Sequence, residues 1–311
     1  MSGLYDVIIL GGGPAGLSAG LYAGRSRLKT LILEKGAPGG QIVLSADVAN
    51  YPGQMLEGET GVTLANRMAA QCDAFGAERR MDTIRAVDLT GEVKRVTGGA
   101  GEYQGRTVII ATGASPRPIG CENEKAFIGK GISYCATCDG AFFRGLDVYV
   151  AGGGDSAVEE ALYLTRFARK VTIIHRRDAL RAARSIQEKA FAEPKIGFLW
   201  DSVVERVDGS DLLDTLLVRN TKTGELTTIK APAADGLLGL FGFIGYTPNT
   251  DLFRDQLELK DGYIPTDEDM RTSIPGVFAV GDVRVKSLRQ VVTAAADGAV
   301  AAVQAEKYLM G

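Results

Sequence analysis

Cysteine and histidine are scarce in this chain, and their scarcity limits the metal chemistry that it can support. Four cysteines and one histidine are spread over 311 residues, and Cys135 and Cys138 form a C-x-x-C pair. A structural zinc site needs a second ligand pair, whereas Cys72, Cys121 and His175 stand alone. Structural disulfides are typical of secreted proteins with more cysteines. The pair therefore favours redox chemistry, and Asp139 beside it could move the accompanying proton.

Excess charge of one sign, long apolar runs and an export signal are also absent. The 35 basic and 38 acidic residues leave a net charge of −3, which gives no electrostatic reason to bind nucleic acid or an anionic membrane. No apolar run approaches the ~18 residues of a membrane-spanning helix, and the N-terminus lacks the basic start of an export signal. We expect a cytoplasmic protein of about two domains, without nucleic-acid or membrane partners.

Glycine, in contrast, is abundant, with 40 residues. The strand-like run 5–10 leads directly into GGGPAG, then a helical stretch, then a second strand-like run that ends on Glu34. This is the plan of a dinucleotide-binding unit. Gly11 permits the tight turn, Gly13 lets the backbone approach a pyrophosphate at the helix N-terminus, and Gly16 lets helix pack on strand. Glu34 can accept hydrogen bonds from the ribose hydroxyls of an adenosine.

Residues 148–176 repeat this plan. A shift of 141 positions lays Gly11 on Gly152 and Glu34 on His175. Basic residues follow the histidine, namely Arg176, Arg177 and, one helical turn beyond, Arg181. An acid repels a 2′-phosphate, whereas guanidinium groups pair with it bidentately. The first unit is therefore predicted to bind an unphosphorylated adenosine and the second NADPH; the alternative is a solvated helix start whose charges have no such role.

The order of the remaining segments predicts an α/β fold of two Rossmann-like domains, the second inserted in the first. A strand at 272–282 and a helix at 288–309 close the chain and need a sheet to join. Between the glycine turns, 60–75 indicates an amphipathic helix and 106–113 a strand, and 195–230 alternates in β fashion. We expect a discontinuous flavin domain, 1–114 and 247–311, around a nicotinamide domain, 117–244, that carries the cysteine pair. Hinges are expected at Ala114–Pro118 and Gly245–Pro248, which are rich in Gly, Pro and small residues.

With these motifs in view, the chain resembles the low-molecular-weight, bacterial-type thioredoxin reductases from roughly Tyr5 to Tyr308. The motifs that carry the resemblance are GGGPAG, the GGQ loop, ATG, CATCDG, GGGDSA, HRRDALR, GYTPNT, and GD followed by RQVVTAA. The resemblance implies a homodimer with FAD on the first unit and NADPH on the second. It also implies a protein partner, thioredoxin or a similar small dithiol protein, and domains that rotate between two states.

The resemblance assigns roles to particular residues. Cys138 is expected to accept electrons from the flavin, Cys135 to attack the partner's disulfide, and Asp139 to handle the proton. FAD is expected to be lined by Gly11, Gly13, Pro14, Ala15, Gly16, Glu34, Gly40, Gln41, Asn50, Thr112, Asp282, Arg289, Gln290 and Ala294. NADPH is expected to be lined by Gly154, Asp155, Ser156, His175, Arg176, Arg177 and Arg181.

Three alternatives remain open from the sequence. Some relatives take electrons from ferredoxin and tend to have eroded second-site motifs, whereas GGGDSA and HRRDALR are intact here, which favours NADPH. An NADPH oxidase or another flavin redox protein could be built on the same scaffold, and a nucleotide-binding redox sensor would undergo the thiol change without turnover. Cys72 and Cys121 are interpreted as ordinary core or surface thiols.

Overall fold

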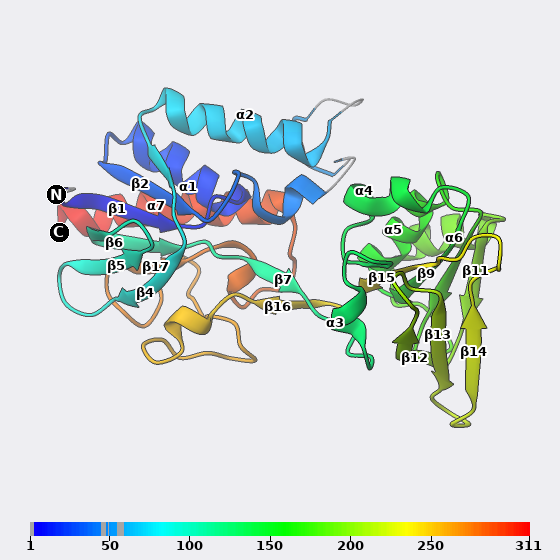
Figure 1. Cartoon of the computed structure of the whole chain (residues 1–311). Coiled ribbons are helices and arrows are strands. Elements are labelled where there is room, and N and C mark those ends of the chain that lie inside the picture. Colours follow the sequence, from blue (N-terminus) through cyan, green and yellow to red (C-terminus); the bar gives the residue numbers. More distant parts are fainter. Residues whose placement is uncertain (1–2, 45–47, 49, 55–58) are drawn as a thin grey trace. The chain divides into compact units, whose positions relative to one another are not determined.

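The computed structural model describes residues 3–44, 48, 50–54 and 59–311, with the side chains of Leu44, Thr137 and Cys138 outside that description. The chain divides into two units (Figure 1). We call residues 1–115 and 247–311 the outer unit, and residues 116–246 the inserted unit. The chain crosses between them in two short strands that pair with each other, β7 (Ala114–Pro116) and β16 (Tyr246–Pro248).

A largely parallel sheet forms the centre of the outer unit. Its parallel strands, in spatial order, are β3 (Glu78–Met81), β2 (Thr30–Glu34), β1 (Tyr5–Leu10), β6 (Glu102–Ile110) and β17 (Val277–Ala279). The first half of β6 also pairs with an antiparallel hairpin, β4 (Ile84–Asp88) and β5 (Lys94–Gly98). Strand β1 is an apolar run because both faces of the sheet are covered.

Three helices cover one face of this sheet (Figure 1), α1 (Pro14–Arg25), α2 (Gly61–Ala74) and α7 (Val291–Met310). Pro14 opens α1 with a preset backbone angle, and Thr60 caps α2 through a reciprocal capping box with Thr63. Helix α7 lies very close to α1, because a Cβ on Gly298 would stand 2.1 Å from the Ala15 carbonyl oxygen. Short 3-10 turns complete the unit, η1 (Gly40–Leu44), η3 (Asp251–Phe253) and η4 (Gly281–Val283).

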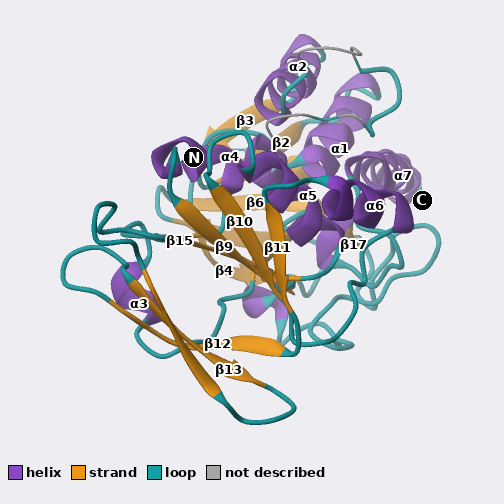
Figure 2. Cartoon of the chain, turned by 90° about the vertical axis from the view of Figure 1, so that its right-hand side faces the viewer, coloured by secondary structure: helices purple, strands orange, loops and turns teal. Residues whose placement is uncertain are grey.

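The inserted unit has its own parallel sheet, in the order β11 (Ile196–Leu199), β10 (Lys170–Ile174), β9 (Asp147–Gly152), β15 (Gly239–Phe243) and β8 (Ile132–Ser133). Helices α4 (Ala136–Asp139), α5 (Asp155–Leu164) and α6 (Arg184–Ala192) lie on one face (Figure 2). An antiparallel sheet covers the other, formed by β12 (Ser202–Asp208), β13 (Thr215–Asn220) and β14 (Leu226–Lys230). Alternate residues of β9 separate the two cores, since Val148 and Val150 face the helices and Ala151 faces the antiparallel sheet. The turns α3 (Glu124–Phe127) and η2 (Gly140–Phe143) flank β8 and α4.

The predicted α/β class with two Rossmann-like units is confirmed, while some element boundaries were wrong. The strand expected at 106–113 begins at Glu102 and ends at Ile110, and the one expected at 272–282 is only Val277–Ala279. The polar strands β3 and β4 were not predicted, because charged side chains obscure their alternation. In the part of the chain that the structure describes, no helix has the length and apolar character needed to cross a membrane.

Candidate functional site

The first glycine turn joins β1 to α1, and its conformation requires glycine at two positions. Gly11 has φ +113°, and a Cβ there would stand 2.3 Å from the Ala111 carbonyl oxygen. A Cβ on Gly16 would stand 1.9 Å from the Gly11 carbonyl oxygen. Gly13 occupies the N-cap of α1 and offers no side-chain cap. The first N–H groups of α1 are therefore available to a phosphate.

Glu34 lies at the end of β2, beside this turn. Its Oε2 accepts a hydrogen bond from the Gly12 N–H at 2.7 Å, and its Oε1 accepts one from the Lys35 N–H at 2.7 Å. These two bonds fix the carboxylate on the turn and leave lone pairs on both oxygens. The arrangement is suited to accept hydrogen bonds from ribose hydroxyls.

The other residues predicted to line FAD gather around the start of α1, from segments far apart in the sequence. Residues 39–41 lie against the turn, because the Gly39 N–H donates to the Gly12 carbonyl oxygen at 2.7 Å. From the end of β6, the Thr112 backbone nitrogen would lie 3.3 Å from a Cβ on Gly11. From η4 and α7, a Cβ on Gly281 would lie 2.9 Å from Ala15 Cβ and 3.8 Å from Ala294 Cβ.

Two further residues predicted to line FAD contact each other. Asn50 Nδ2 donates a hydrogen bond to Gln290 Oε1 at 3.0 Å.

Asp282 and Arg289 each have a buried polar atom that lacks a partner in the described part of the chain. No described group donates to Asp282 Oδ1, and none accepts from Arg289 Nε. Burial raises the pKa of Asp282 above its usual value, and the cations of Lys286 and Arg289 oppose that rise. The Arg289 guanidinium lies over the Tyr263 ring, 4.2 Å from its centroid. A buried carboxylate oxygen without a donor fits a ligand that brings hydroxyl groups, as FAD does.

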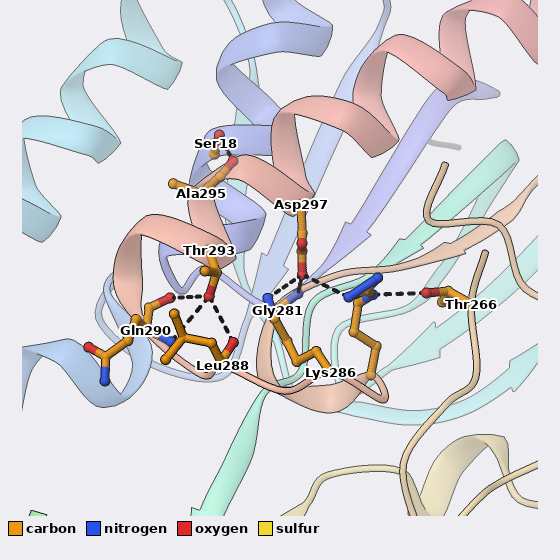
Figure 3. A network of polar contacts seen from close by, with 10 residues as sticks. Ser18, Thr266, Gly281, Lys286, Leu288, Gln290, Thr293, Ala295 and Asp297 are labelled. Carbon is orange, nitrogen blue, oxygen red and sulfur yellow. Dashed lines mark hydrogen bonds and ion pairs between the residues drawn. The ribbon is translucent and has the colours of Figure 1, made fainter. Parts of the chain in front are cut away.

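A buried charge network, not predicted from the sequence, holds η4 in place (Figure 3). Asp297 Oδ2, on α7, accepts from the Gly281 N–H at 2.9 Å and from Lys286 Nζ at 2.7 Å. Arg284 lies 3.8 Å from the same oxygen and donates to Thr266 Oγ1 at 2.8 Å. The Lys286 and Asp297 side chains are 7% and 10% exposed, so the pair is shielded from water. Asp297 therefore ties α7 to the turn that presents Asp282.

The second glycine turn, between β9 and α5, repeats the first in the inserted unit. Gly152 has φ +154° and Gly154 occupies the N-cap of α5. The Arg181 N–H donates to the Gly153 carbonyl oxygen at 2.7 Å, and Asp155 Oδ1 accepts from the Ala183 N–H at 2.6 Å. These two bonds place the Arg181 segment on the turn. The predicted residues Ser156, Arg176, Arg177 and Arg181 are all exposed.

His175 is the one predicted NADPH residue that is deeply buried, at 5% exposure. It lies beneath the turn, since a Cβ on Gly153 would stand 2.3 Å from its Nδ1. Burial lowers the pKa of His175, and the nearby Arg181 lowers it further. Its Nε2 has no hydrogen-bond partner among the described residues. The imidazole is thus held neutral, with one polar atom left for a ligand.

The redox segment follows β8, and a serine that the sequence did not point out organises it. Cys135 is disulfide-bonded; the Cys138 side chain lies outside the described part, so its predicted role stays a prediction. Ser133 Oγ donates to Asp139 Oδ2 at 2.6 Å and accepts from the Cys135 N–H at 3.0 Å. The structure thus brings Asp139 to the backbone of Cys135, as its proposed role in proton handling requires.

The other two cysteines have structural positions. Cys72 Sγ donates to the Leu17 carbonyl oxygen at 2.9 Å, and burial raises its pKa to about 11. Burial raises the pKa of Cys121 to about 12. Both are free and buried, so neither is a reactive thiolate at neutral pH. No cluster of three or more metal-ligating side chains occurs among the described residues.

Comparisons with known proteins agree with this arrangement. The family model described as pyridine nucleotide-disulphide oxidoreductase matches residues 5–298. A thioredoxin reductase from Peptoclostridium litorale is 56% identical over 310 residues, 99% of this chain and 98% of that protein. The crystal structure of Lactococcus lactis thioredoxin reductase in its FR conformation has a TM-score of 0.93 at 45% identity, covering 98% of this chain and 99% of that one. A ferredoxin-flavin thioredoxin reductase from Clostridium acetobutylicum is 25% identical, with a TM-score of 0.53, and covers 99% of this chain and 98% of that one.

Proposed function

We propose that this chain, which belongs to the pyridine nucleotide-disulphide oxidoreductase family and within it to the thioredoxin reductases, uses NADPH and FAD to reduce the disulfide of thioredoxin or a similar small dithiol protein. It is an oxidoreductase whose electrons leave through the Cys135–Cys138 pair. The observation that carries the proposal is the occurrence of two glycine turns of one geometry in a chain that also holds a disulfide-bonded Cys135 beside Asp139.

FAD belongs to the outer unit, which is then a discontinuous FAD-binding domain of residues 1–114 and 247–311. The N-terminus of α1 receives the pyrophosphate, Glu34 the adenosine ribose, and Asp282 a hydroxyl of the ribityl chain. Support comes from the buried Asp282 Oδ1, which lacks a donor among the described residues. FAD bound there would supply the two-electron chemistry that links NADPH to a disulfide. The protein supplies position, charge and proton handling.

NADPH belongs to the inserted unit, in a binding domain of residues 117–244. The N-terminus of α5 receives its pyrophosphate, and Arg176, Arg177 and Arg181 pair with the 2′-phosphate. The hydrogen bonds from Arg181 to Gly153 and from Ala183 to Asp155 support this assignment, because they join the basic segment to the phosphate-binding turn. His175 stays neutral beneath the turn and can share a hydrogen bond with the ligand.

The thiol chemistry then belongs to three neighbouring residues. The Cys135 thiolate attacks the partner's disulfide, and one partner sulfur leaves and takes a proton. The Cys138 thiolate attacks Cys135 Sγ in the resulting mixed disulfide, which releases the second partner sulfur and closes the Cys135–Cys138 bond. Two electrons pass to the partner, and Asp139 moves the protons.

The chain is further proposed to act as a homodimer in the cytoplasm. A groove of about 400 Å³ between α1 and α7 is lined by apolar side chains including Leu17, Leu21 and Tyr22, and a second copy would cover it. A reducing compartment that supplies NADPH is where such a thiol is kept reduced. Light scattering of the purified protein tests the dimer, and a monomeric mass would contradict it.

The proposed electron path is tested by NADPH oxidation in the presence of oxidised thioredoxin. Cys138→Ser should abolish turnover, yet leave FAD bound and reducible by NADPH. The matched control is Cys121→Ala, which removes a buried thiol from the same unit and should keep the wild-type rate. Near wild-type thioredoxin reduction by Cys138→Ser would refute the path.

A further inference from the structure

Ser133 occupies the centre of a small ring of hydrogen bonds around the redox segment. It is the last residue of β8 and is only 5% exposed. Its hydroxyl donates to Asp139 Oδ2 at 2.6 Å and accepts from the Cys135 N–H at 3.0 Å. The Asp139 N–H in turn donates to the Cys135 carbonyl oxygen at 3.2 Å. The three residues therefore hold one another in a closed loop of contacts.

The serine hydroxyl has one proton and two acceptors within reach. The Cys135 carbonyl oxygen lies 3.2 Å from Ser133 Oγ, whereas Asp139 Oδ2 lies at 2.6 Å. A distance of 2.5–2.7 Å is typical of a hydroxyl that donates to an ionised carboxylate. The carbonyl already accepts from the Asp139 N–H, so the carboxylate is the better acceptor. The hydroxyl proton thus points at Asp139.

We propose that Ser133 is a positioning residue for proton transfer at the redox cysteines, an inference that rests on the proposed function. The Ser133 hydroxyl donates its hydrogen bond to Asp139 Oδ2. The proton that Asp139 transfers is therefore taken up and released at Oδ1. Ser133 also holds the Asp139 carboxyl group in one orientation through this bond. Its oxygen fixes the Cys135 backbone, so the thiol and the carboxyl group keep one spacing while protons move.

The proton balance of the exchange reaction shows where the positioning of Asp139 matters. The reduced chain begins with two thiols and the partner with one disulfide; afterwards the chain holds the disulfide and the partner two thiols. Asp139 takes a proton from a thiol of the chain and gives it to a leaving sulfur of the partner, so no net proton is consumed. The reaction needs a carboxyl group that can return to the carboxylate form. Loss of the Ser133 donor leaves the orientation of that carboxyl group unfixed.

The test compares pH–rate profiles of dithiol–disulfide exchange in the holoenzyme. A hydrogen bond to a charged group contributes about 1.5 kcal/mol, so Ser133→Ala should slow exchange about tenfold and lower the whole profile. Flavin reduction by NADPH in stopped flow should be unchanged. Ser133→Thr keeps the hydroxyl and should restore both the rate and the profile.

A matched control and a double variant separate positioning from general destabilisation. Thr215 Oγ1 donates to Asp214 Oδ1 at 2.6 Å elsewhere in the inserted unit, so Thr215→Val removes the same kind of bond and should leave the profile unmoved. In an Asp139→Asn background, Ser133→Ala should slow exchange less than about twofold, because its effect passes through Asp139. An unmoved profile in Ser133→Ala, or a full tenfold loss in the Asp139→Asn background, would overturn the inference.

A cyclic alkyl disulfide, used in place of thioredoxin, separates a failure of the proposed partner from a failure of the role of Ser133. If the wild type reduces the small disulfide but not thioredoxin, the proposed partner is wrong, and the Ser133 profiles can still be measured. If wild-type exchange is normal with both acceptors and Ser133→Ala behaves like wild type, only the role of Ser133 is wrong.

Discussion

The two glycine turns of this chain share one backbone geometry and differ in what surrounds them. Gly13 and Gly154 occupy equivalent N-caps, with φ −74° and ψ −178° in the first and φ −92° and ψ −178° in the second. Gly11 and Gly152 both have positive φ. This common part is what a pyrophosphate requires, since backbone N–H groups at a helix start bind it in either unit.

The first difference is how closely the helix packs against each turn. The outer turn is pressed closely against its own helix and is supported by α7, so Gly16 and Gly298 have no room for a Cβ. In the inserted unit, Ala157 occupies the position equivalent to Gly16 and is fully buried. The third glycine of the motif therefore reflects how closely helix and strand approach, and a slightly wider approach permits alanine.

The second difference lies at the end of the second strand. The outer unit has Glu34, bound to the Gly12 N–H, whereas the inserted unit has His175 beneath Gly153, followed by exposed arginines. We infer that the turn selects a dinucleotide as a class. We propose that the residues after the second strand distinguish one adenosine ribose from another.

The largest expected effect concerns the support that α7 gives to the outer unit. Lys286→Met leaves the buried Asp297 carboxylate without its closest cation, and such a loss costs about 3–5 kcal/mol. Trp200, the single tryptophan, lies in the inserted unit. The denaturation midpoint followed by circular dichroism should fall for the outer unit, while the transition followed by Trp200 fluorescence should not move.

Lys222→Met is the control, because Lys222 is 59% exposed in its pairs with Asp178 and Asp201. Exposed pairs contribute about 0–1 kcal/mol. If both lysine variants had the same small effect, the Asp297 network would not stabilise the outer unit.

A reciprocal exchange at the third glycine tests the close approach of helix and strand. Gly16→Ala places a Cβ 1.9 Å from the Gly11 carbonyl oxygen, and overpacking of this kind costs about 3 kcal/mol. Purified Gly16→Ala should be unstable and poor in flavin. Ala157→Gly should lower stability by about 1 kcal/mol, the intrinsic cost of glycine in a helix. Equal flavin content in Gly16→Ala and wild type would show that the outer turn tolerates the wider spacing.

The arginines after His175 are tested through cofactor choice. Arg176 and Arg177 are exposed, so each should contribute about tenfold to NADPH affinity. The double variant Arg176→Ala, Arg177→Ala should raise the KM for NADPH about a hundredfold and barely change that for NADH. Arg206 and Arg219 pair with Asp208 and Glu205 on the antiparallel sheet, so their double alanine variant is the control. An unchanged KM for NADPH would show that the arginines belong to a solvated helix start and do not bind the 2′-phosphate.

The smallest effect is the pH dependence of stability expected from His175. Burial depresses the pKa of His175 in the folded state, whereas the unfolded chain takes up a proton near pH 6.5. The stability of the inserted unit should therefore be fully present above pH 6.5 and fall as the pH drops towards the folded pKa. The slope from one group is at most about 1.4 kcal/mol per pH unit. Trp200 fluorescence should show this loss in wild type and not in His175→Gln; the same slope in both would assign it to other groups.

How far the sequence predicted these features depends on how local they are. The two βαβ units were predictable because strand, glycine turn, helix and second strand follow one another within about thirty residues. The strand β17 was misplaced because long-range pairing with β6 decides it. The hairpin of β4 and β5 was missed because charged side chains interrupt β4, and because β5 completes its pairing only on β6. Helix α7 was placed well, at Val291–Met310, because its small apolar residues form one continuous segment.

The predicted site residues of the outer unit are gathered at one place, but their supporting residues were not predicted. Ser133 and Asp297 carry no motif of their own, and their partners are backbone N–H groups that a sequence does not reveal. An acid in an alanine-rich helix was the available signal for Asp297, since burial of such a residue requires a cation. For Ser133 the signal was its place two residues before the first cysteine.

Anaerobic titration of the flavoprotein tests most directly whether two dinucleotide sites supply one dithiol. NADPH should bleach the flavin and, with one equivalent for the flavin and a second for the disulfide, bring each chain to full reduction. NADH and reduced ferredoxin should be far less effective, and Cys135→Ser should reach full reduction after the first equivalent. Efficient reduction by ferredoxin with little response to NADPH would contradict the assignment of the second turn.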